Sequence, residues 1–446
     1  MAVLATDMQP GTARADKRST IAFRALVLFS LLYYARPEDV ITPLRWVPIS
    51  KIVGIICVIG LIAGLGRRRK MKFPLALTFL LLLFAQMIVS IPFALGWRGE
   101  AFQMVFSSFA KGVVVAVLIA LLVETLPQLR RLLFVQAAAV SFMALSSLAL
   151  HHTNSGRLIG AAGGIFENSN DLAINIAVNL PLCFAFFLQA RGAVRKALWG
   201  IPVVAMLAVV LLTYSRSGFL ALMMAGIVCL WEFGIKGRRF HLVLVAVAAV
   251  VLMMAFAPAH YFTRLESIYA GRIKNSGDRG SEEGRKELFQ LSIHWMMQRP
   301  LVGVGPGNFP IVTGKWLVAH NTYSEMGAEV GVPGLVLFLL VLGAGMKNLF
   351  VSQKSALFKA NGEFRIFTGG LMASMAAYML GAFFADTAYN LFPYFLVAYT
   401  CGLRQIAEHP ETTLAANVQP KPAPPQVVAN AYTRRATADL APDRRG

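Results

Sequence analysis

The chain has 446 residues, of which 57% are hydrophobic and only 14% are charged. This composition is too apolar for an ordinary soluble domain of that length, so it favours a membrane protein. The formal net charge of +20 would suggest a nucleic-acid partner in a soluble protein. In a membrane protein, basic residues concentrated in the loops of one side account for such a charge, and we expect no nucleic-acid partner.

The hydrophobic residues are gathered into runs long enough to cross a bilayer as helices. About 17 to 25 apolar residues span ~30 Å of hydrocarbon at about 1.5 Å per residue. The sequence predicts twelve such spans, near residues 21–35, 47–65, 73–95, 101–124, 132–150, 170–190, 197–213, 219–235, 241–258, 332–347, 366–385 and 388–404. The predicted fold is therefore all-α: a polytopic membrane protein of about 12 transmembrane helices with one large periplasmic loop that contains short helices.

Basic residues recur in every second loop between the predicted spans. The densest group is Arg67, Arg68, Arg69, Lys70 and Lys72, and further groups lie at residues 130–131, 191–196, 236–239 and 347–365. Because short loops rich in Lys and Arg face the cytoplasm, we expect these loops and both termini on that side. The chain is then predicted to be a multi-pass membrane protein whose long segment at 259–330 lies on the side opposite the cytoplasm.

The chain is predicted to divide into five parts. These are a cytoplasmic leader at 1–20, transmembrane helices 1–9 at 21–258, a periplasmic catalytic loop at 259–330, transmembrane helices 10–12 at 331–405 and a cytoplasmic tail at 406–446. The tail is rich in Pro, Ala and polar residues without periodicity, so we expect it to be disordered. The long loop is expected to be functional, since connections in compact folds are usually short.

The sequence gives little support to metal or cofactor chemistry. The four cysteines, Cys57, Cys183, Cys229 and Cys401, each fall within an apolar run and lack the paired spacing of a metal site. His151 and His152 follow the fifth predicted span, with no carboxylate or cysteine at ligand spacing. Residues 303–307, Gly-Val-Gly-Pro-Gly, follow no predicted strand and predict a tight turn instead of a nucleotide loop. We therefore expect no disulfide, no metal and no cofactor.

Arg216 is the first candidate for chemistry. It lies in the segment Tyr-Ser-Arg-Ser-Gly at 214–218, between two apolar runs at the predicted outer boundary of the membrane. An arginine near membrane depth costs up to about 2.5 to 3.5 kcal/mol on insertion scales, so it usually has a partner or lines a wet cavity. The alternative is an arginine whose side chain snorkels from a helix end to the interface.

Arg285 is the second candidate, in a segment at 282–298 that predicts an amphipathic helix. One polar stripe of this helix holds Glu283, Glu287, Gln290, His294 and Gln298. At about 100° per residue, Arg285 falls on the opposite face, with Leu288, Phe289, Trp295 and Met296. Its guanidinium is thus expected to point towards the protein or the membrane, and snorkelling is again the alternative.

His320 is the third candidate. The residues after Asn321 form Thr322-Tyr-Ser-Glu325, which has the capping-box pattern of a helix start. The positive end of a helix dipole disfavours an imidazolium, so we expect a neutral His320 that can accept a proton near pH 7. A purely structural histidine is the alternative.

These motifs resemble those of the O-antigen ligase family and its polymerase relatives. The pattern His320-Asn321, nine residues, Gly331, two residues, Gly334 is similar to the family's signature. The segment Ser-Arg-Ser-Gly at 215–218 resembles its upstream arginine motif, and Arg285 with the segment Arg-Pro-Leu-Val-Gly at 299–303 resembles its large periplasmic loop.

A further segment, Phe-Glu-Asn-Ser-Asn at 166–170, is similar to a family segment that usually has Pro before its second Asn. Here Ser169 takes the place of that Pro, immediately before Asn170. The strong part of the resemblance covers about residues 160–335, and residues 1–150 match in hydropathy only.

The resemblance implies a glycosyltransferase that moves a glycan from undecaprenyl diphosphate to an acceptor sugar hydroxyl at the periplasmic face. It implies His320 as general base, Arg216 and Arg285 as catalytic residues that bind the donor diphosphate, and Asn321 and Asn170 as substrate-binding residues. The implied partners are the undecaprenyl-diphosphate-linked donor, a glycan or lipid A core acceptor, and membrane lipid.

Alternatives within and outside this superfamily remain open at the level of sequence. An O-antigen or exopolysaccharide polymerase would use the same donor and differ only in its acceptor. A protein O-oligosaccharyltransferase and a polysaccharide transporter are weaker alternatives. A transporter would be expected to show internal repeats and charged residues near the bilayer midplane, and neither is clear in this sequence.

Overall fold

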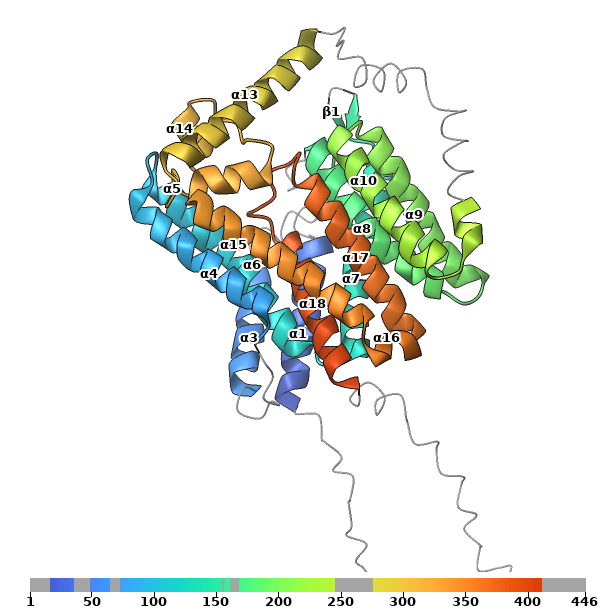
Figure 1. Cartoon of the computed structure of the whole chain (residues 1–446). Coiled ribbons are helices and arrows are strands. Elements are labelled where there is room, and N and C mark those ends of the chain that lie inside the picture. Colours follow the sequence, from blue (N-terminus) through green and yellow to red (C-terminus); the bar gives the residue numbers. More distant parts are fainter. Residues whose placement is uncertain are drawn as a thin grey trace, which may run out of the picture.

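A computed structural model of the chain shows a bundle of helices (Figure 1). It describes residues 17–35, 49–64, 73–154, 156–160, 168–244 and 276–410. Most of the expected span at 241–258, the first part of the expected periplasmic loop up to residue 275, and most of the expected leader and tail lie outside the described residues.

The described residues in the first part of the chain form five longer helices and five short elements. They are α1 (Lys17–Ala35), α3 (Ile49–Gly64), α4 (Leu75–Ser90), the 3-10 turn η3 (Ile91–Phe93), α5 (Arg98–Gln103), the π-helical turn η4 (Met104–Phe109), α6 (Ala110–Leu122), α7 (Leu126–Leu150), β1 (Thr153–Asn154) and β2 (Arg157–Leu158).

The second half contributes the remaining helices. They are α8 (Ser169–Gln189), α9 (Ala193–Leu212), α10 (Arg216–Cys229), the π-helical turn η5 (Leu230–Ile235), α13 (Ser276–Gln298), α14 (Phe309–Thr313), α15 (Thr322–Gln353), α16 (Ala356–Ala360), α17 (Gly362–Gly381) and α18 (Phe392–Glu408).

Every expected span that falls within the described residues is helical, which confirms the predominantly helical fold. Among the described residues, seven helical segments are long and apolar enough to cross a membrane: Leu75–Phe93, Arg98–Leu122, Leu126–Leu150, Ser169–Gln189, Ala193–Leu212, Arg216–Ile235 and Thr322–Gln353. The twelve expected spans are therefore confirmed only in part. The helices α3 and α18 have 16 and 17 residues, which is short for a bilayer crossing.

The structure differs from the expected elements in two details. The helix α18 continues to Glu408, beyond the predicted start of the tail at residue 406. The strands β1 and β2 form a small antiparallel hairpin, so the described chain is not entirely helical. Strands of two residues are too short to show the alternating apolar and polar pattern by which a strand is predicted from sequence.

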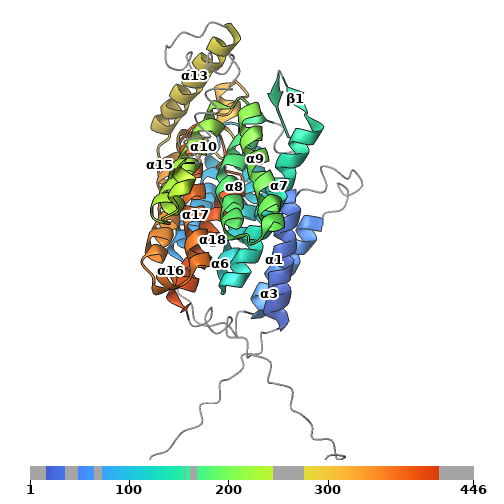
Figure 2. The same cartoon turned by 90° about the vertical axis from the view of Figure 1, so that its right-hand side faces the viewer.

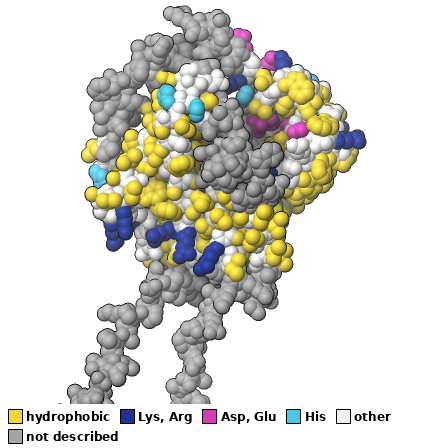
Figure 3. Space-filling view, turned by 180° about the vertical axis from the view of Figure 1, so that it is seen from behind, with side chains coloured by type: hydrophobic (Ala, Val, Ile, Leu, Met, Phe, Trp, Pro, Cys, Tyr) yellow, Lys and Arg dark blue, Asp and Glu magenta, His cyan; other side chains and the backbone are white. Residues whose placement is uncertain are grey.

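The bundle has two ends that differ in composition. Figures 1 and 2 place α13 and β1 at one end and α16 at the other. Because neighbouring helices alternate in direction, the starts of α8, α10 and α15 lie at the α13 end. In Figure 3, a row of Lys and Arg side chains crosses the lower part of one face, whereas the visible Asp and Glu side chains lie in the upper half together with a few further Lys and Arg side chains. This distribution agrees with the alternation of basic loops that the sequence predicts.

Buried aromatic side chains fill the region where α17 and α18 approach each other. Tyr378 on α17 and Tyr394, Phe395 and Tyr399 on α18 are almost fully enclosed. The Tyr394 hydroxyl donates to the carbonyl of Ala388, in the segment that connects the two helices. Large aromatic side chains contribute much of the packing energy of a core, so this region holds the connecting segment in place.

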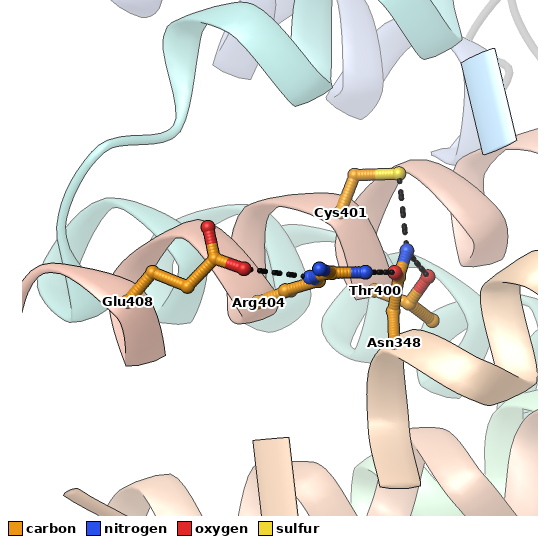
Figure 4. Close-up of polar contacts among 5 residues, drawn as sticks. All are labelled: Asn348, Thr400, Cys401, Arg404 and Glu408. Atoms are coloured by element: carbon orange, nitrogen blue, oxygen red, sulfur yellow. Dashed lines mark hydrogen bonds and ion pairs between the residues drawn. The ribbon is translucent and has the colours of Figure 1, made fainter. Parts of the chain in front are cut away.

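A polar cluster joins α15 to α18 at the end of the bundle away from α13 (Figure 4). The Asn348 amide nitrogen donates to the Thr400 hydroxyl at 3.3 Å and to the Cys401 sulfur at 3.5 Å. The Asn348 oxygen accepts from the Arg404 guanidinium at 3.2 Å, and Arg404 also pairs with Glu408 at 2.8 Å. Buried polar groups need such partners, so these hydrogen bonds offset the cost of burying Asn348, which is 5% exposed.

The long helix α15 is broken at Gly331, whose φ of 81° and ψ of 175° are not helical. The chain after the break is held by the Val332 N–H, which donates to the Pro300 carbonyl at 2.7 Å. On the other side, the amide nitrogen of Gln86 on α4 donates to the carbonyls of Leu301 at 2.7 Å and Val330 at 3.2 Å. These hydrogen bonds hold the segment around Pro300 between α15 and α4.

We predict that Gly331→Ala destabilises the protein by about 1 to 3 kcal/mol, because it forces a side chain into the left-handed region. The new Cβ would also lie 2.7 Å from the Pro300 oxygen and the Leu301 carbonyl carbon. The matched control is Gly343→Ala in the same helix, where a Cβ meets nothing within 4 Å and alanine favours the helix. Thermal unfolding in detergent measures both variants, and equal midpoints for the two would contradict the prediction.

Candidate functional site

The helix α13 carries Arg285 on its inner face. Leu288 is 3% exposed and packs with Phe309, Ala319 and Ala328, and Trp295 covers the same cluster. Arg285 lies about one turn before Leu288 and is half-buried. The expected amphipathic helix is therefore present, although one residue expected on its inner face, Phe289, is 42% exposed.

His320 and Arg285 line the same cavity, which has a volume of about 240 Å³. Its walls also contain Leu288 and Leu317, and at its rim Lys315 forms an ion pair with Glu287 at 2.8 Å. His320 has a φ of 53°, so it occupies a left-handed turn immediately before α15. The cavity thus places a permanent cation and an imidazole together at the α13 end of the bundle.

The pKa of His320 is lowered from its usual 6.5, first because burial penalises the imidazolium and second because the Arg285 charge repels it. The sequence predicted a neutral histidine but attributed it to the dipole of the following helix. Burial and Arg285 are the causes in the structure. A neutral imidazole at pH 7 can accept a proton, which is the property a general base requires.

Asn321 begins α15 as its N-cap. Its side-chain oxygen accepts from the N–H groups of Tyr323 at 3.0 Å and Ser324 at 3.1 Å. The N-cap therefore lies one residue before the expected Thr322, and the expected capping box between Thr322 and Glu325 does not form. Glu325, the expected return partner, accepts instead from the N–H of Ala319 at 2.8 Å. This bond fixes the residue that precedes His320, so Glu325 supports the histidine turn from inside the protein.

The Gly-rich segment at 303–307 forms a turn that packs on α15. The N–H groups of Val304 and Gly305 donate to the carbonyls of Ala328 and Glu329 at 2.8 and 2.9 Å. At Gly303, with a φ of 67°, a Cβ would lie 2.3 Å from the Glu329 carbonyl carbon. The structure thus confirms a turn whose glycines permit close backbone approach.

Arg216 begins α10 in a second polar cluster. Ser215, the N-cap, accepts from the N–H of Gly218 at 3.2 Å and donates to the Asn170 oxygen at 2.8 Å. The same Asn170 oxygen accepts from Arg157 at 2.8 Å. Arg216 is half-buried and is not among the residues that line the Arg285–His320 cavity. The structure therefore brings Arg216 together with Asn170, and Arg285 together with His320.

Asp386 lies in the segment between α17 and α18. It interacts electrostatically with Glu329 on α15 and with Asp171 on α8. Burial raises its pKa, and the carboxyl groups of Glu329 on α15 and Asp171 on α8 raise it further. Asp171 follows Asn170, whereas Glu329 binds the Gly-rich turn. Asp386 thus interacts with one carboxyl group beside Asn170 and with another that binds the Gly-rich turn.

Sequence reasoning missed Arg157, Glu325, Glu329, Asp386 and Tyr389. One signal was available for Arg157, because it is the lone basic residue between the fifth and sixth predicted spans, in a loop expected on the side poor in such residues. Glu325 and Glu329 were also visible as two carboxyl groups one turn apart in an apolar helix. Their partners lie elsewhere in the chain and give no local signal.

The described residues contain no group of three or more His, Cys, Asp or Glu side chains placed to hold a metal ion. His151 and His152 are exposed where α7 leads into the hairpin. All four cysteines are buried within helices and unpaired with one another.

The fold and the cavity define a multi-pass helical membrane protein with a cationic and basic site at one end of its helices. Residues 201–339 match the family model described as O-antigen ligase, a range that includes Arg216, Arg285 and His320. This match confirms the resemblance noted in the sequence: residues 201–339 are similar to the O-antigen ligase and polymerase superfamily, a family that suggests a lipid-linked glycan transferase.

The other two comparisons add no functional information. No curated protein matches the sequence. Among solved structures, the chain aligns with one titled "Structural coordination of polymerization and crosslinking by a peptidoglycan synthase complex", at 15% identity and a TM-score of 0.43. The alignment covers 75% of this chain and 96% of that one.

We predict that Arg285→Gln raises the pKa of His320 towards 6.5. Removing a nearby positive charge lets the imidazole hold its proton to higher pH, while burial continues to act in the opposite direction. The matched control is Lys315→Gln, which removes a cation from the same cavity that is paired with Glu287. Titration of the His320 ring signals by NMR measures both, and the prediction is wrong if Arg285→Gln leaves the titration midpoint unchanged.

Proposed function

We propose that the protein is a glycosyltransferase that moves a glycan from undecaprenyl diphosphate to an acceptor sugar hydroxyl at the periplasmic face of the inner membrane, as an O-antigen ligase. The observation that carries this proposal is the cavity that joins Arg285 to a His320 of lowered pKa. Both residues lie in the region that matches the O-antigen ligase model. A cation beside a neutral base suits a transfer in which an anion leaves and a proton is removed.

In the proposed reaction, the acceptor hydroxyl oxygen attacks the anomeric carbon of the donor glycan. The bond from that carbon to the diphosphate oxygen breaks, and the lipid diphosphate leaves with the bonding electrons. His320 takes the proton of the attacking hydroxyl. The guanidinium groups of Arg285 and Arg216 stabilise the negative charge of the leaving group by charge-assisted hydrogen bonds.

The cavity also offers groups suited to a sugar acceptor. Lys315 and Glu287 present a hydrogen-bond donor and an acceptor at the rim, where hydroxyl groups would arrive. Leu288 and Leu317 line the wall between them and His320. The acceptor sugar is thus proposed to lie across the rim with its reacting hydroxyl towards the histidine.

The two asparagines are proposed to act through the shape of the site. Asn321 caps α15 and so fixes the turn that carries His320. Asn170 connects Ser215 to Arg157 and so fixes the turn that carries Arg216. Their side-chain oxygens are engaged in these bonds, which supports a positioning role within the binding site.

We predict that the α13 end of the bundle faces the periplasm. A cysteine introduced by Glu283→Cys, at an exposed position of α13, should react in intact cells with a membrane-impermeant maleimide. The matched control is Lys196→Cys, exposed at the start of α9, which should react only after the inner membrane is broken. The native cysteines are buried and should give little background. The opposite labelling pattern would reverse the topology and overturn the proposed function.

We predict that His320→Ala slows transfer by at least about a hundredfold, since general base catalysis typically contributes about 10² to 10⁴ in rate. Donor binding and thermal stability should stay close to wild type. The purified variant is assayed for transfer from a lipid-linked donor, with His294→Ala, an exposed histidine of α13, as the matched control. Near-normal turnover of His320→Ala would remove the histidine from the mechanism.

A further inference from the structure

We infer that Arg157 is a positioning residue of the donor site, which holds Arg216 in place through Asn170 and the Thr213 carbonyl. The Arg157 Nε donates to the Thr213 oxygen at 2.9 Å, and its Nη2 donates to the Asn170 Oδ1 at 2.8 Å. The inference rests on the proposed function, in which Arg216 binds the diphosphate of the donor. It adds a residue that lies outside the region matched by the family model.

The hairpin fixes the backbone on both sides of Arg157. The strand β2 pairs with β1 so that Asn154 lies opposite Arg157 and Thr153 opposite Leu158. Leu158 is 1% exposed and anchors the hairpin in the core, and the N–H of Ile159 donates to the His152 carbonyl at 3.0 Å. The guanidinium of Arg157 is therefore presented from a strand that is paired with its neighbour and anchored in the core by Leu158.

The turn before α10 is the part that needs support. Tyr214 has a φ of 48°, a left-handed conformation that is unfavourable for a bulky side chain and persists only where the surroundings hold it. Arg157 binds the carbonyl of Thr213, directly before Tyr214. Through Asn170 it also reaches Ser215, directly after Tyr214. The strained residue is thus held from both sides by one guanidinium.

Close packing transmits this constraint to Arg216. A Cβ at Gly218 would lie 2.3 Å from the Cβ of Ala173, so α10 and α8 touch almost backbone to backbone. The Gly218 N–H is bound by Ser215, which is 3% exposed. With the first turn of α10 fixed against α8, the direction of the Arg216 side chain depends on the turn that Arg157 holds.

The geometry requires the fork of an arginine. Two donors of one planar group serve two acceptors on different elements, Thr213 after α9 and Asn170 in α8. A lysine carries the same charge but has no planar pair of donors in fixed directions. A role by charge alone therefore predicts that lysine restores function, whereas the positioning role predicts that it does not.

The test measures binding of undecaprenyl diphosphate and the KM and kcat of transfer, using the full-length protein in nanodiscs. Arg157→Ala and Arg157→Lys should each weaken lipid diphosphate binding about tenfold or more, and should raise the KM for the donor and lower kcat, because Arg216 is proposed both to bind the diphosphate and to stabilise its charge as it leaves. The matched control is Arg131→Ala, an exposed arginine at the start of α7, which should leave both readouts unchanged. Full recovery of binding by Arg157→Lys overturns the inference.

A double-mutant cycle separates this inference from the proposed function. If Arg157 acts through Arg216, then Arg157→Ala combined with Arg216→Ala should bind no more weakly than Arg216→Ala alone. Additive losses overturn the positioning role. Wild-type binding by Arg216→Ala overturns the donor role of Arg216 itself, while weak binding by Arg216→Ala with normal binding by Arg157→Ala overturns only the inference. If Arg157→Ala does not fold, Asn170→Ala removes the same hydrogen-bond connection from the side of α8. It then takes the place of Arg157→Ala in the cycle with Arg216→Ala.

Discussion

The buried carboxyl group of Glu329 joins the three segments that surround the site. It accepts from the N–H groups of Gly307 at 2.9 Å and Phe309 at 3.0 Å, and from the hydroxyl of Tyr389. Glu329 is 1% exposed, so the loss of any of these donors would leave a buried polar group unsatisfied. The Gly-rich turn, α14 and the connection between α17 and α18 therefore keep one arrangement around α15, which carries the histidine turn at its start.

Periodicity was sufficient to predict the parts of the site that depend on one element. The inward face of α13 follows from residues spaced along a single helix, so the half-buried position of Arg285 could be expected from the sequence alone. The cap of α15 shows where this reasoning ends. Asn321 and Thr322 are both good N-cap residues, and the pattern does not choose between them. Glu325 accepts instead from the N–H of Ala319, and this donor is near only because of the path of the turn before α15.

The remaining contacts depend on how distant segments meet, and no local pattern encodes that. Tyr389 is 60 positions from Glu329, and Ser215 is 45 positions from Asn170. Hydropathy predicts that helices exist but gives no neighbours, so it could not show that Arg216 shares a cluster with Arg157 and not with His320. It also does not fix where each helix ends, and the described helices α3 and α18 have 16 and 17 residues against the roughly 20 of a typical span.

The break in α15 explains a polar residue in the middle of an apolar helix. Within hydrocarbon, backbone carbonyls freed by a break have no water to bind, so another group must satisfy them. Gln86 of α4 does this for Val330 and Leu301, next to the break at Gly331. The side chain at position 86 and the backbone at position 331 therefore depend on each other in this structure: a continuous helix at 331 would leave Gln86 without the Val330 carbonyl as an acceptor, whereas the broken helix uses the amide donor of Gln86.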